Sequence, residues 1–258
     1  MIRTHVEQGA ILVITMDRPP ANAIDQVMSD GLDAAFNRFE DDASLRVAIV
    51  TGAGDRFFSA GWDLKEVAAG RDDEDQFGRG GYMGLTERFS LNKPVIAAVN
   101  GTAAGGGFEL ALACDLVVAA SGARFVLPEA RNGMVAEGGG VIRAPRILPP
   151  MIAMELLLTG LPLTAEDLFR HGFVNRVVAA DAVLSTALEL AAAIVRAAPT
   201  SVAATKEIIR ETGHLTIREA YAAMRTGPMP AYRRMRASPN RVEGPRAFVE
   251  KRQPDWEP

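Results

Sequence analysis

The sequence predicts an α/β core followed by a helical C-terminal region. Over roughly the first 130 residues, short apolar stretches of strand character alternate with helical stretches. Such alternation is typical of strands joined by short right-handed crossovers. From about Ala182 onward only helical patterns follow, and the turn at 198–201 marks a boundary. We therefore expect a core over residues 1–198 and a helical region for subunit packing over residues 199–258.

The elements are expected in a regular order. Besides the alternating N-terminal residues, strands are expected over 9–18, 46–54, 94–101, 123–130 and 175–178. An amphipathic helix over 21–42 and a helix that leads into a strand over 108–120 complete the core. The C-terminal helices are expected over 182–198, 200–213, 216–226 and 243–252, with Thr200 or Ser201 as the cap of the second.

One segment, 70–81, is expected to be a mobile surface loop. Its sequence, "GRDDEDQFGRGG", is charged and rich in glycine, which is typical of loops. A loop of this kind beside a site can act as a lid, although a plain surface loop is the default interpretation.

The composition is that of an ordinary globular protein of 258 residues, with 48% hydrophobic and 23% charged residues and a net charge of −4. No apolar run approaches the ~20 residues of a membrane-spanning helix. The N-terminal residues also lack the apolar block and cleavage site of a signal peptide. We therefore expect a cytoplasmic protein with no membrane segment. Residues 201–258 are net positive, which would suit an anionic ligand or simply reflect solvated helix faces.

Cysteine and histidine usage argues against thiol and metal chemistry. The single cysteine, Cys114, cannot form an internal disulfide, and its apolar setting predicts a small core residue. His5, His171 and His214 lie far apart, with no second ligand at helical or turn spacing. All three are interpreted as structural or surface residues, and no metal site is expected.

Two glycine-bearing turns follow predicted strands, in "VTGAGDRFFSAGWDLKE" and in "VNGTAAGGGFELA". Neither is a nucleotide signature, because the first lacks the third glycine of G-x-G-x-x-G and no G-K-[ST] occurs in the chain. Both turns present backbone amides where a helix is expected to begin, at 61–62 and 105–107. Two amides that converge on one oxygen form an oxyanion hole, but the residues alone do not show convergence.

Three blocks resemble the signature motifs of the enoyl-CoA hydratase/isomerase (crotonase) superfamily: "FFSAGWDLKE", "KPVIAAVNGTAAGGGFELALACDLVVAA" and "ARFVLPEARNGM". They occur in the family's order and spacing, and the resemblance extends from "DRPPANAID" to "GPRAFVEKR". It implies the ClpP/crotonase-like spiral of ββα units. It also implies that the C-terminal helices pack neighbouring subunits into homotrimers, often paired as hexamers.

The resemblance implies a lyase that adds water to the C2=C3 bond of a short-chain enoyl-CoA thioester, or removes it. The amides of Trp62 and Gly106 would bind the thioester oxygen, where negative charge develops. Glu109 and Glu129 match the family's two catalytic glutamates, with Glu109 activating the water and Glu129 exchanging the proton at C2. A coupled pair can divide these roles differently. No metal or redox cofactor is implied, since coenzyme A arrives as part of the substrate.

A further set of residues is implied to contact the substrate and CoA: Ala21, Ala23, Ala60, Gly61, Asp63, Leu64, Lys65, Gly105, Phe248 and Lys251. In the family, backbone corresponding to 21–23 and 60–64 follows the adenine and pantetheine. Lys65 would approach the phosphates, and Phe248 and Lys251 would close the nucleotide side. Both lysines are equally well interpreted as solvated charges.

Within the superfamily, the motifs together with "ILPPMIAMELLLTG" most resemble carnitinyl-CoA dehydratases, which interconvert carnitinyl-CoA and crotonobetainyl-CoA. The alternatives are a general enoyl-CoA hydratase, a Δ3,Δ2-enoyl-CoA isomerase, and a non-catalytic acyl-CoA- or RNA-binding member. Because a binding protein has no need of two acid–base groups, the Glu109/Glu129 pair argues against the last alternative.

Positions 62, 136 and 137 depart from the family pattern. Many relatives have proline at the position of Ala136, and Glu137 beside it is a third carboxylate that could tune the pair, bind a substrate cation or face water. Most relatives have a small residue at the position of Trp62. Its indole either packs beneath the segment 70–81 or offers an aromatic face to a trimethylammonium group.

Overall fold

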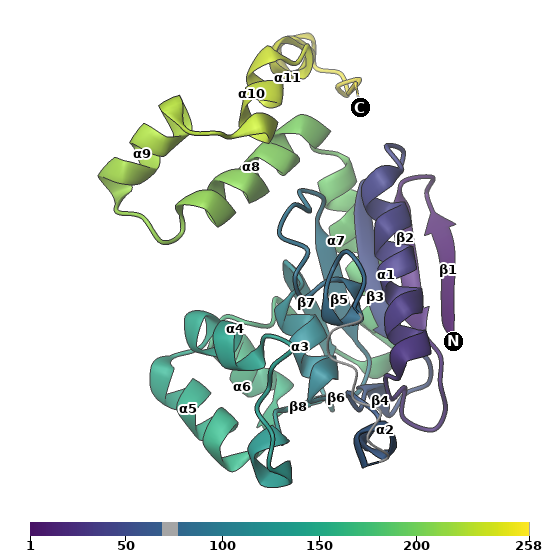
Figure 1. Cartoon of the computed structure of the whole chain (residues 1–258). Helices are drawn as coiled ribbons and strands as arrows, with labels where there is room; N and C mark the ends of the chain where they lie inside the picture. The colour runs from purple at the N-terminus through teal and green to yellow at the C-terminus, as the bar shows by residue number, and fades with distance from the viewer. Residues whose placement is uncertain (69–76, 258) are drawn as a thin grey trace.

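A six-stranded sheet in the order β1-β2-β3-β5-β7-β10 forms the core of the computed structural model, which describes residues 1–68 and 77–257 (Figure 1). Its strands run parallel except β1, which pairs antiparallel with β2. They are β1 (Ile2–Glu7), β2 (Ile11–Met16), β3 (Val47–Gly52), β5 (Val95–Val99), β7 (Leu116–Ala120) and β10 (Arg176–Val178). The predicted α/β core is confirmed.

A smaller sheet lies at one end of the first, in the order β4-β6-β8-β9 (Figure 1). Strands β4, β6 and β8 are parallel, and β9 pairs antiparallel with β8. Their bounds are β4 (Phe57–Ser59), β6 (Thr102–Ala104), β8 (Arg124–Val126) and β9 (Leu163–Thr164). The sequence analysis did not separate β4 and β6 from the turns around them, because three residues are too few to display an alternating pattern.

The two sheets are built from a repeated unit. Strand β3 leads into β4 and then α2 (Leu64–Ala68), and β5 leads into β6 and then α3 (Gly106–Leu112). Strand β7 leads into β8, the 3₁₀ turn η3 (Glu129–Asn132) and then α4 (Gly140–Ile147). One strand of each unit therefore enters the larger sheet and the next enters the smaller one. This arrangement confirms the spiral of ββα units.

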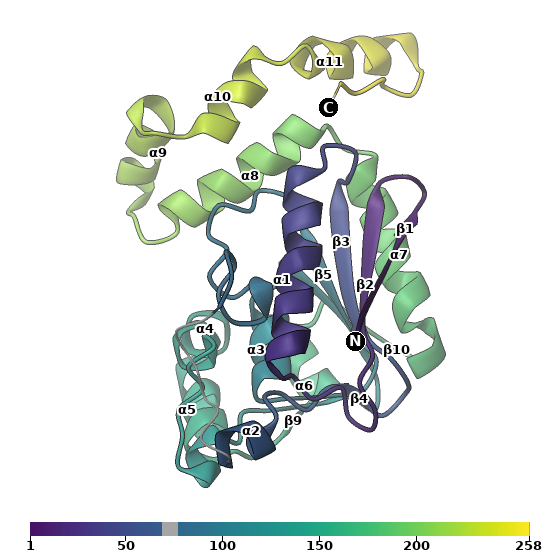
Figure 2. The same cartoon turned by 45° about the vertical axis from the view of Figure 1, so that its right-hand side comes forward.

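Helices α1 (Gln26–Asp41) and α7 (Val183–Val195) cover opposite faces of the larger sheet (Figure 2). Because both faces are covered, β3 and β5 are buried at every residue and consist of almost continuous apolar runs. The α1 helix begins five residues later than expected, because Asp25 is its N-cap and accepts a hydrogen bond from the Met28 amide.

The remaining helices form two groups at opposite ends of the molecule (Figures 1 and 2). Beside the smaller sheet lie α4, α5 (Pro150–Thr159) and α6 (Ala165–Arg170). At the other end an arm consists of α8 (Pro199–Thr212), α9 (Ile217–Thr226), α10 (Pro230–Ala237) and α11 (Asn240–Glu250). Two short 3₁₀ turns, η2 (Tyr82–Gly84) and η4 (Ala180–Ala182), complete the described elements.

Buried and partly buried polar contacts hold the start of this arm in place. Lys206 on α8 forms an ion pair with Asp115, with 2.7 Å between Nζ and Oδ2. Glu207, which is only 2% exposed, accepts hydrogen bonds from the amides of Ala231 and Tyr232 at 3.0 and 2.8 Å. Its carboxylate thereby satisfies free N–H groups at the start of α10.

The structure corrects the predicted cap of α8. Neither Thr200 nor Ser201 caps this helix, because Pro199 occupies its first turn and Ala198 is the N-cap, with no side-chain hydrogen bond. Proline suits this position because its fixed φ is helical and its missing N–H would have no partner there. The sequence analysis also missed α10, a short and strongly basic helix.

Residues 70–76 of the predicted surface loop lie outside the described part of the chain. The described end of the same segment is partly packed, since Phe77 is half-buried and Gly80 and Gly81 are buried, whereas Gly78 and Arg79 are exposed. Within the described residues, no single helix is long and apolar enough to span a membrane. Only the pair Ala180–Val195 and Pro199–Thr212, bent by 103° at the break, reaches that length and composition together.

Candidate active site

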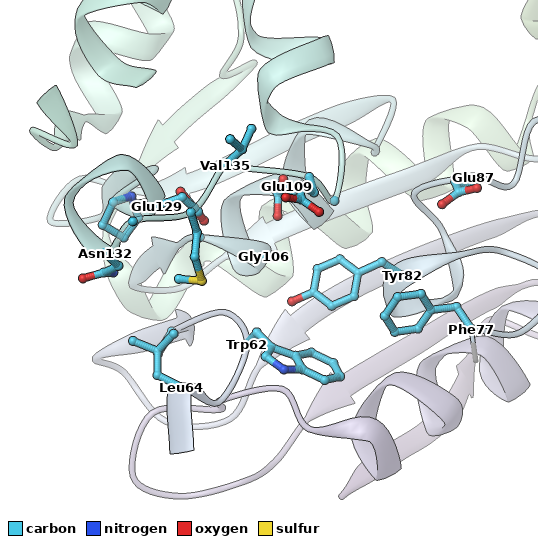
Figure 3. A pocket seen from close by; sticks show the side chains of 17 residues that line it. Trp62, Leu64, Phe77, Tyr82, Glu87, Gly106, Glu109, Glu129, Asn132 and Val135 are labelled. Atoms are coloured by element: carbon cyan, nitrogen blue, oxygen red, sulfur yellow. The ribbon is translucent and has the colours of Figure 1, made fainter. Parts of the chain in front are cut away.

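A cavity of about 430 Å³ lies at the carboxyl ends of β4, β6 and β8 (Figure 3). Each ββα unit supplies lining residues just after its second strand, because parallel strands bring equivalent loops to the same edge. The lining residues are Ala60, Trp62, Leu64, Phe77, Tyr82, Glu87, Gly105, Gly106, Glu109, Pro128, Glu129, Asn132, Gly133, Met134, Val135, Glu137 and Gly138. The topology alone thus gathers both predicted glycine turns and both predicted glutamates.

The three consecutive glycines of "GGGFE" each lie against a different part of the site. A Cβ at Gly105 would lie 2.8 Å from Glu129 Oε1, and φ there is +52°, which disfavours other residues. A Cβ at Gly106 would lie 2.2 Å from the Tyr82 hydroxyl. At Gly107 it would lie 2.5 Å from a backbone oxygen of β4. The triplet therefore lets α3 approach a carboxylate, a phenol and the neighbouring strand at once.

The amides of Trp62 and Gly106 come from adjoining turns. A Cβ at Gly61, where φ is +81°, would lie 2.8 Å from the Gly106 nitrogen. The Ile24 amide donates to the Gly61 carbonyl, and the Asp63 amide donates to the Ile24 carbonyl. The Trp62 amide, which lies between Gly61 and Asp63 in the chain, takes no part in this bridge. Within the described residues, neither the Trp62 nor the Gly106 amide donates to a backbone carbonyl. Two adjoining amides are thus available to a ligand oxygen.

Glu109 is the buried carboxyl group of the site, at 3% exposed. Its Oε1 accepts a hydrogen bond of 2.8 Å from the Gly140 amide. Burial raises the pKa of Glu109 to about 7, because desolvation outweighs this hydrogen bond, and the charges of Glu129 and Glu137 add to the rise. Near neutral pH this side chain can therefore take up or release a proton.

Glu129 opens the η3 turn and lies beside Glu109 in the cavity (Figure 3). Burial raises its pKa as well. Its Oε2 is buried and has no hydrogen-bond partner among the described residues. A buried carboxyl oxygen without a partner is costly in the ionised form, which agrees with the raised pKa, and a ligand that supplies a donor would satisfy it.

Three aromatic rings form one wall of the cavity. Trp62 and Phe77 have ring centroids 6.0 Å apart at an interplanar angle of 89°. Tyr82 lies 5.4 Å from each of the other two, measured between centroids. Figure 3 shows the three side chains grouped opposite Glu109. The indole of Trp62 thus packs against Phe77, from the segment 70–81, and also lines the cavity.

The structure brings most of the predicted site residues together. Ala60, Leu64 and Gly105 line the cavity with the four predicted catalytic residues. The segment that contains Ala21 and Ala23 lies directly beside Ala60 at the edge of the cavity, because the Ala60 amide donates to the Ala21 carbonyl. These positions are compatible with contacts to a long thioester ligand.

Other predicted residues have different surroundings. Asp63 forms an ion pair with Arg18 at 2.9 Å, so its side chain fixes the turn and does not line the cavity. Lys65 is exposed and also outside the lining. Phe248 and Lys251 belong to the arm at the opposite end of the molecule and do not line the cavity of their own chain (Figure 1). Cys114 is partly buried against the core, as expected.

Sequence reasoning missed several residues of the site. Phe77, Tyr82 and Glu87 lie in an irregular segment with no periodic pattern, so no sequence signal placed them beside the cavity. The sequence analysis also overlooked a second glycine triplet, 138–140, which indicates a close approach of backbone to the site. A Cβ at Gly138 would lie 2.6 Å from Glu109 Oε2, and Gly140 supplies the amide bound to Oε1.

Comparison with known proteins agrees with this geometry. The model of the enoyl-CoA hydratase/isomerase family matches residues 6–258. A carnitinyl-CoA dehydratase from Proteus mirabilis is 53% identical over 249 residues, which are 96% of this chain and 95% of the relative. One from Salmonella arizonae is 54% identical over 248 residues, with the same coverage of each chain.

A solved structure extends the comparison to three dimensions. The enoyl-CoA hydratase from Mycobacterium tuberculosis superposes with a TM-score of 0.89 at 41% identity, covering 99% of this chain and 98% of the other. The resemblance inferred from the three sequence blocks is therefore confirmed. With a family model that spans nearly the whole chain and relatives more than half identical to it, this protein belongs to the enoyl-CoA hydratase/isomerase family.

Proposed function

We propose that this protein is a carnitinyl-CoA dehydratase, a hydro-lyase that interconverts carnitinyl-CoA with crotonobetainyl-CoA and water. The observation that carries the proposal is that Glu109 and Glu129 line the same cavity, beside two adjoining backbone amides. Burial raises the pKa of both carboxyl groups, that of Glu109 to about 7, and we propose that the pair holds a single proton. A shared proton is what addition or removal of water requires.

In the hydration direction, ionised Glu109 accepts a proton from water as the water oxygen bonds to C3. The electrons of the C2=C3 bond move toward C2 and the thioester oxygen, and the amides of Trp62 and Gly106 donate hydrogen bonds to that oxygen. Protonated Glu129 then gives its proton to C2. Glu109 gains one proton and Glu129 loses one, so the pair still holds one proton, and the dehydration of carnitinyl-CoA follows the same steps in reverse. Water, two carboxyl groups and the thioester suffice, so we propose that no metal or redox cofactor takes part.

The remaining contacts of the substrate are also part of the proposal. Backbone of 21–23 and 60–64 follows the adenine and pantetheine, and Lys65 approaches the phosphates. Because Phe248 and Lys251 lie far from the cavity of their own chain, they can close a nucleotide site only on a neighbouring subunit (Figure 1).

We propose a homotrimer, or a hexamer of two trimers, in the cytoplasm. Several apolar side chains of the arm are well exposed in the single chain, which supports this assembly: Ile209, Ile217, Tyr221, Val242, Phe248 and Val249. Light scattering after size-exclusion chromatography measures the subunit number, and a monomer would contradict both the assembly and the shared nucleotide site.

The activity is tested by incubating the purified protein with crotonobetainyl-CoA and with crotonyl-CoA. Loss of enoyl-thioester absorbance, with carnitinyl-CoA identified by mass, is the expected result for the first substrate. The variants Glu109→Gln and Glu129→Gln should each lose ~10²–10⁴-fold in rate. Faster turnover of crotonyl-CoA would favour a general hydratase, and conversion of a 3-enoyl-CoA alone would favour an isomerase. Thioester binding without any turnover would indicate a binding protein.

A further inference from the structure

The wall formed by Trp62, Phe77 and Tyr82 has properties that acid–base chemistry does not require. Addition of water needs two carboxyl groups and an oxyanion site, none of which calls for three clustered rings. We propose that these rings, with Glu87 at their edge, are the binding subsite for the quaternary ammonium group of the substrate. This inference deepens the proposed function and rests on it.

The spacing of the rings is compatible with a cation held against two of them, although Trp62 and Phe77 also meet in a T-shaped contact. A cation about 4 Å above each of two perpendicular rings requires ring centroids about 6 Å apart, which is within cation–π range. The centroids of Trp62 and Phe77 are 6.0 Å apart at 89°. Tyr82, tilted by 56° against Trp62 and by 61° against Phe77, adds a third ring at 5.4 Å from both. A trimethylammonium group has no N–H to donate, so aromatic faces are suitable partners for it.

The charged side chains that line the cavity are acidic, and Arg143, outside the lining, offsets part of their charge through its interactions with Glu109 and Glu87. Four carboxyl groups line it, those of Glu87, Glu109, Glu129 and Glu137, and no Lys, Arg or His is among its described lining residues. Glu87 makes no ion pair with another described residue. Figure 3 shows Glu87 beyond Tyr82 and Phe77, at the aromatic end. Such a lining attracts a positively charged acyl group and repels an anionic one.

The subsite also lies at the right place along the substrate. In carnitinyl-CoA a single methylene separates the quaternary nitrogen from C3, so the cation must bind next to the reacting carbons. A Cβ at Gly106 would lie 2.2 Å from the Tyr82 hydroxyl, and a Cβ at Gly138 would lie 2.5 Å from the Tyr82 ring and 2.6 Å from Glu109 Oε2. The ring wall therefore adjoins both the oxyanion site and the carboxyl group that activates water.

A neutral isostere separates charge from shape. In 5,5-dimethylhex-2-enoyl-CoA a carbon atom replaces the quaternary nitrogen of crotonobetainyl-CoA, and the outline of the acyl group is unchanged. We expect the native protein to prefer the charged substrate in kcat/KM. Phe77→Leu should reduce this preference by up to ~30-fold, the upper end of a cation–π contribution. Glu87→Gln, an exposed position, should reduce it by a few-fold.

Phe89→Leu is the matched control. Phe89 follows in the same segment and is 66% exposed, outside the cavity lining. We expect it to keep the native preference. If Phe77→Leu and Glu87→Gln lower kcat/KM by the same factor for both thioesters, these side chains only pack, and the inference is overturned.

Calorimetry of both thioesters with the native protein and with Phe77→Leu keeps the inference separate from the proposed function. If the charged thioester binds more tightly than its isostere and Phe77→Leu removes that difference, the subsite is supported even where the native protein turns over neither. Lack of turnover would refute only the proposed function. Equal affinity of the native protein for the two thioesters would refute the subsite whatever the turnover.

Discussion

Replacing Glu109 by glutamine should stabilise the fold while it removes most of the activity. The buried carboxyl group titrates with a pKa of about 7, against 4.5 as its ordinary value, because burial disfavours the ionised form. Glutamine has nearly the same volume and keeps an oxygen that can accept the hydrogen bond from the Gly140 amide. The substitution therefore removes mainly the charge.

The magnitude follows from the linkage between protonation and folding. A carboxyl group whose pKa is raised in the folded state lowers the free energy of unfolding wherever the unfolded chain ionises it more readily. This penalty is complete above pH 7, where the group is ionised in both states, and it disappears below pH 4.5, where the group is protonated in both. A shift from 4.5 to about 7 corresponds to a penalty of about 3 kcal/mol at pH 8 and about 1 kcal/mol at pH 5. Glu109→Gln should thus gain about 2 kcal/mol more at pH 8 than at pH 5.

Urea unfolding of the native and variant proteins at both pH values measures this difference. Glu155→Gln, at an exposed position on α5, controls for the removal of a carboxylate as such. Equal effects of Glu109→Gln at the two pH values would show that the Glu109 pKa is not raised. A variant less stable than the native protein at pH 8 would show that the carboxylate of Glu109 is favourable in the fold.

Three other substitutions test separate parts of the site and the arm. Gly106→Val should abolish turnover and weaken thioester binding in calorimetry, because even its Cβ would lie 2.2 Å from the Tyr82 hydroxyl. Normal affinity and turnover would contradict the close approach of the Tyr82 hydroxyl to Gly106. Trp62→Leu, which keeps the backbone amide, should reduce the preference for crotonobetainyl-CoA over crotonyl-CoA by up to ~30-fold; an equal fall in both kcat/KM values would make Trp62 a packing residue. Glu207→Ala should loosen α10, since two amides lose their acceptor at ~1–3 kcal/mol each, and faster proteolysis of the arm checks this.

Much of this architecture could be predicted because its signals are local. The apolar runs of β3 and β5 indicate strands buried on both faces, and three motif blocks in register indicate the family. The same blocks placed Glu109 and Glu129 at the site, and both line the cavity. The position of Glu109 after three glycines also has a physical explanation, because each glycine admits a neighbour that a side chain would exclude.

The rest of the site depends on contacts between distant segments. Phe77 and Tyr82 line the cavity from η2 and the residues just before it, and nothing in "FGRGGYMG" predicts these contacts. Likewise, the raised pKa of Glu109 depends on burial and on Glu129 and Glu137, which lie 20 and 28 positions further along the chain. Such features depend on tertiary packing, which periodicity and motif spacing do not describe.

The acidic lining and the cationic substrate together suggest that the substrate helps to prepare its own general base. Burial, helped by the charges of Glu129 and Glu137, raises the pKa of Glu109 to about 7 in the free protein, against the opposing effects of the Gly140 hydrogen bond and Arg143. Hydration needs Glu109 ionised. A quaternary ammonium group bound against the neighbouring rings adds one positive charge, which favours the ionised carboxylate and lowers the pKa of Glu109.

The acid limb of kcat should therefore lie at lower pH than the acid limb of kcat/KM, since the first reports the bound complex and the second the free protein. With the neutral isostere the two limbs should nearly coincide, because only the charge differs between the substrates. A separation of the same size for both thioesters would mean that occupancy alone shifts the pKa, by excluding water. A separation confined to the cationic substrate would mean that the charge of the substrate sets the protonation state of Glu109.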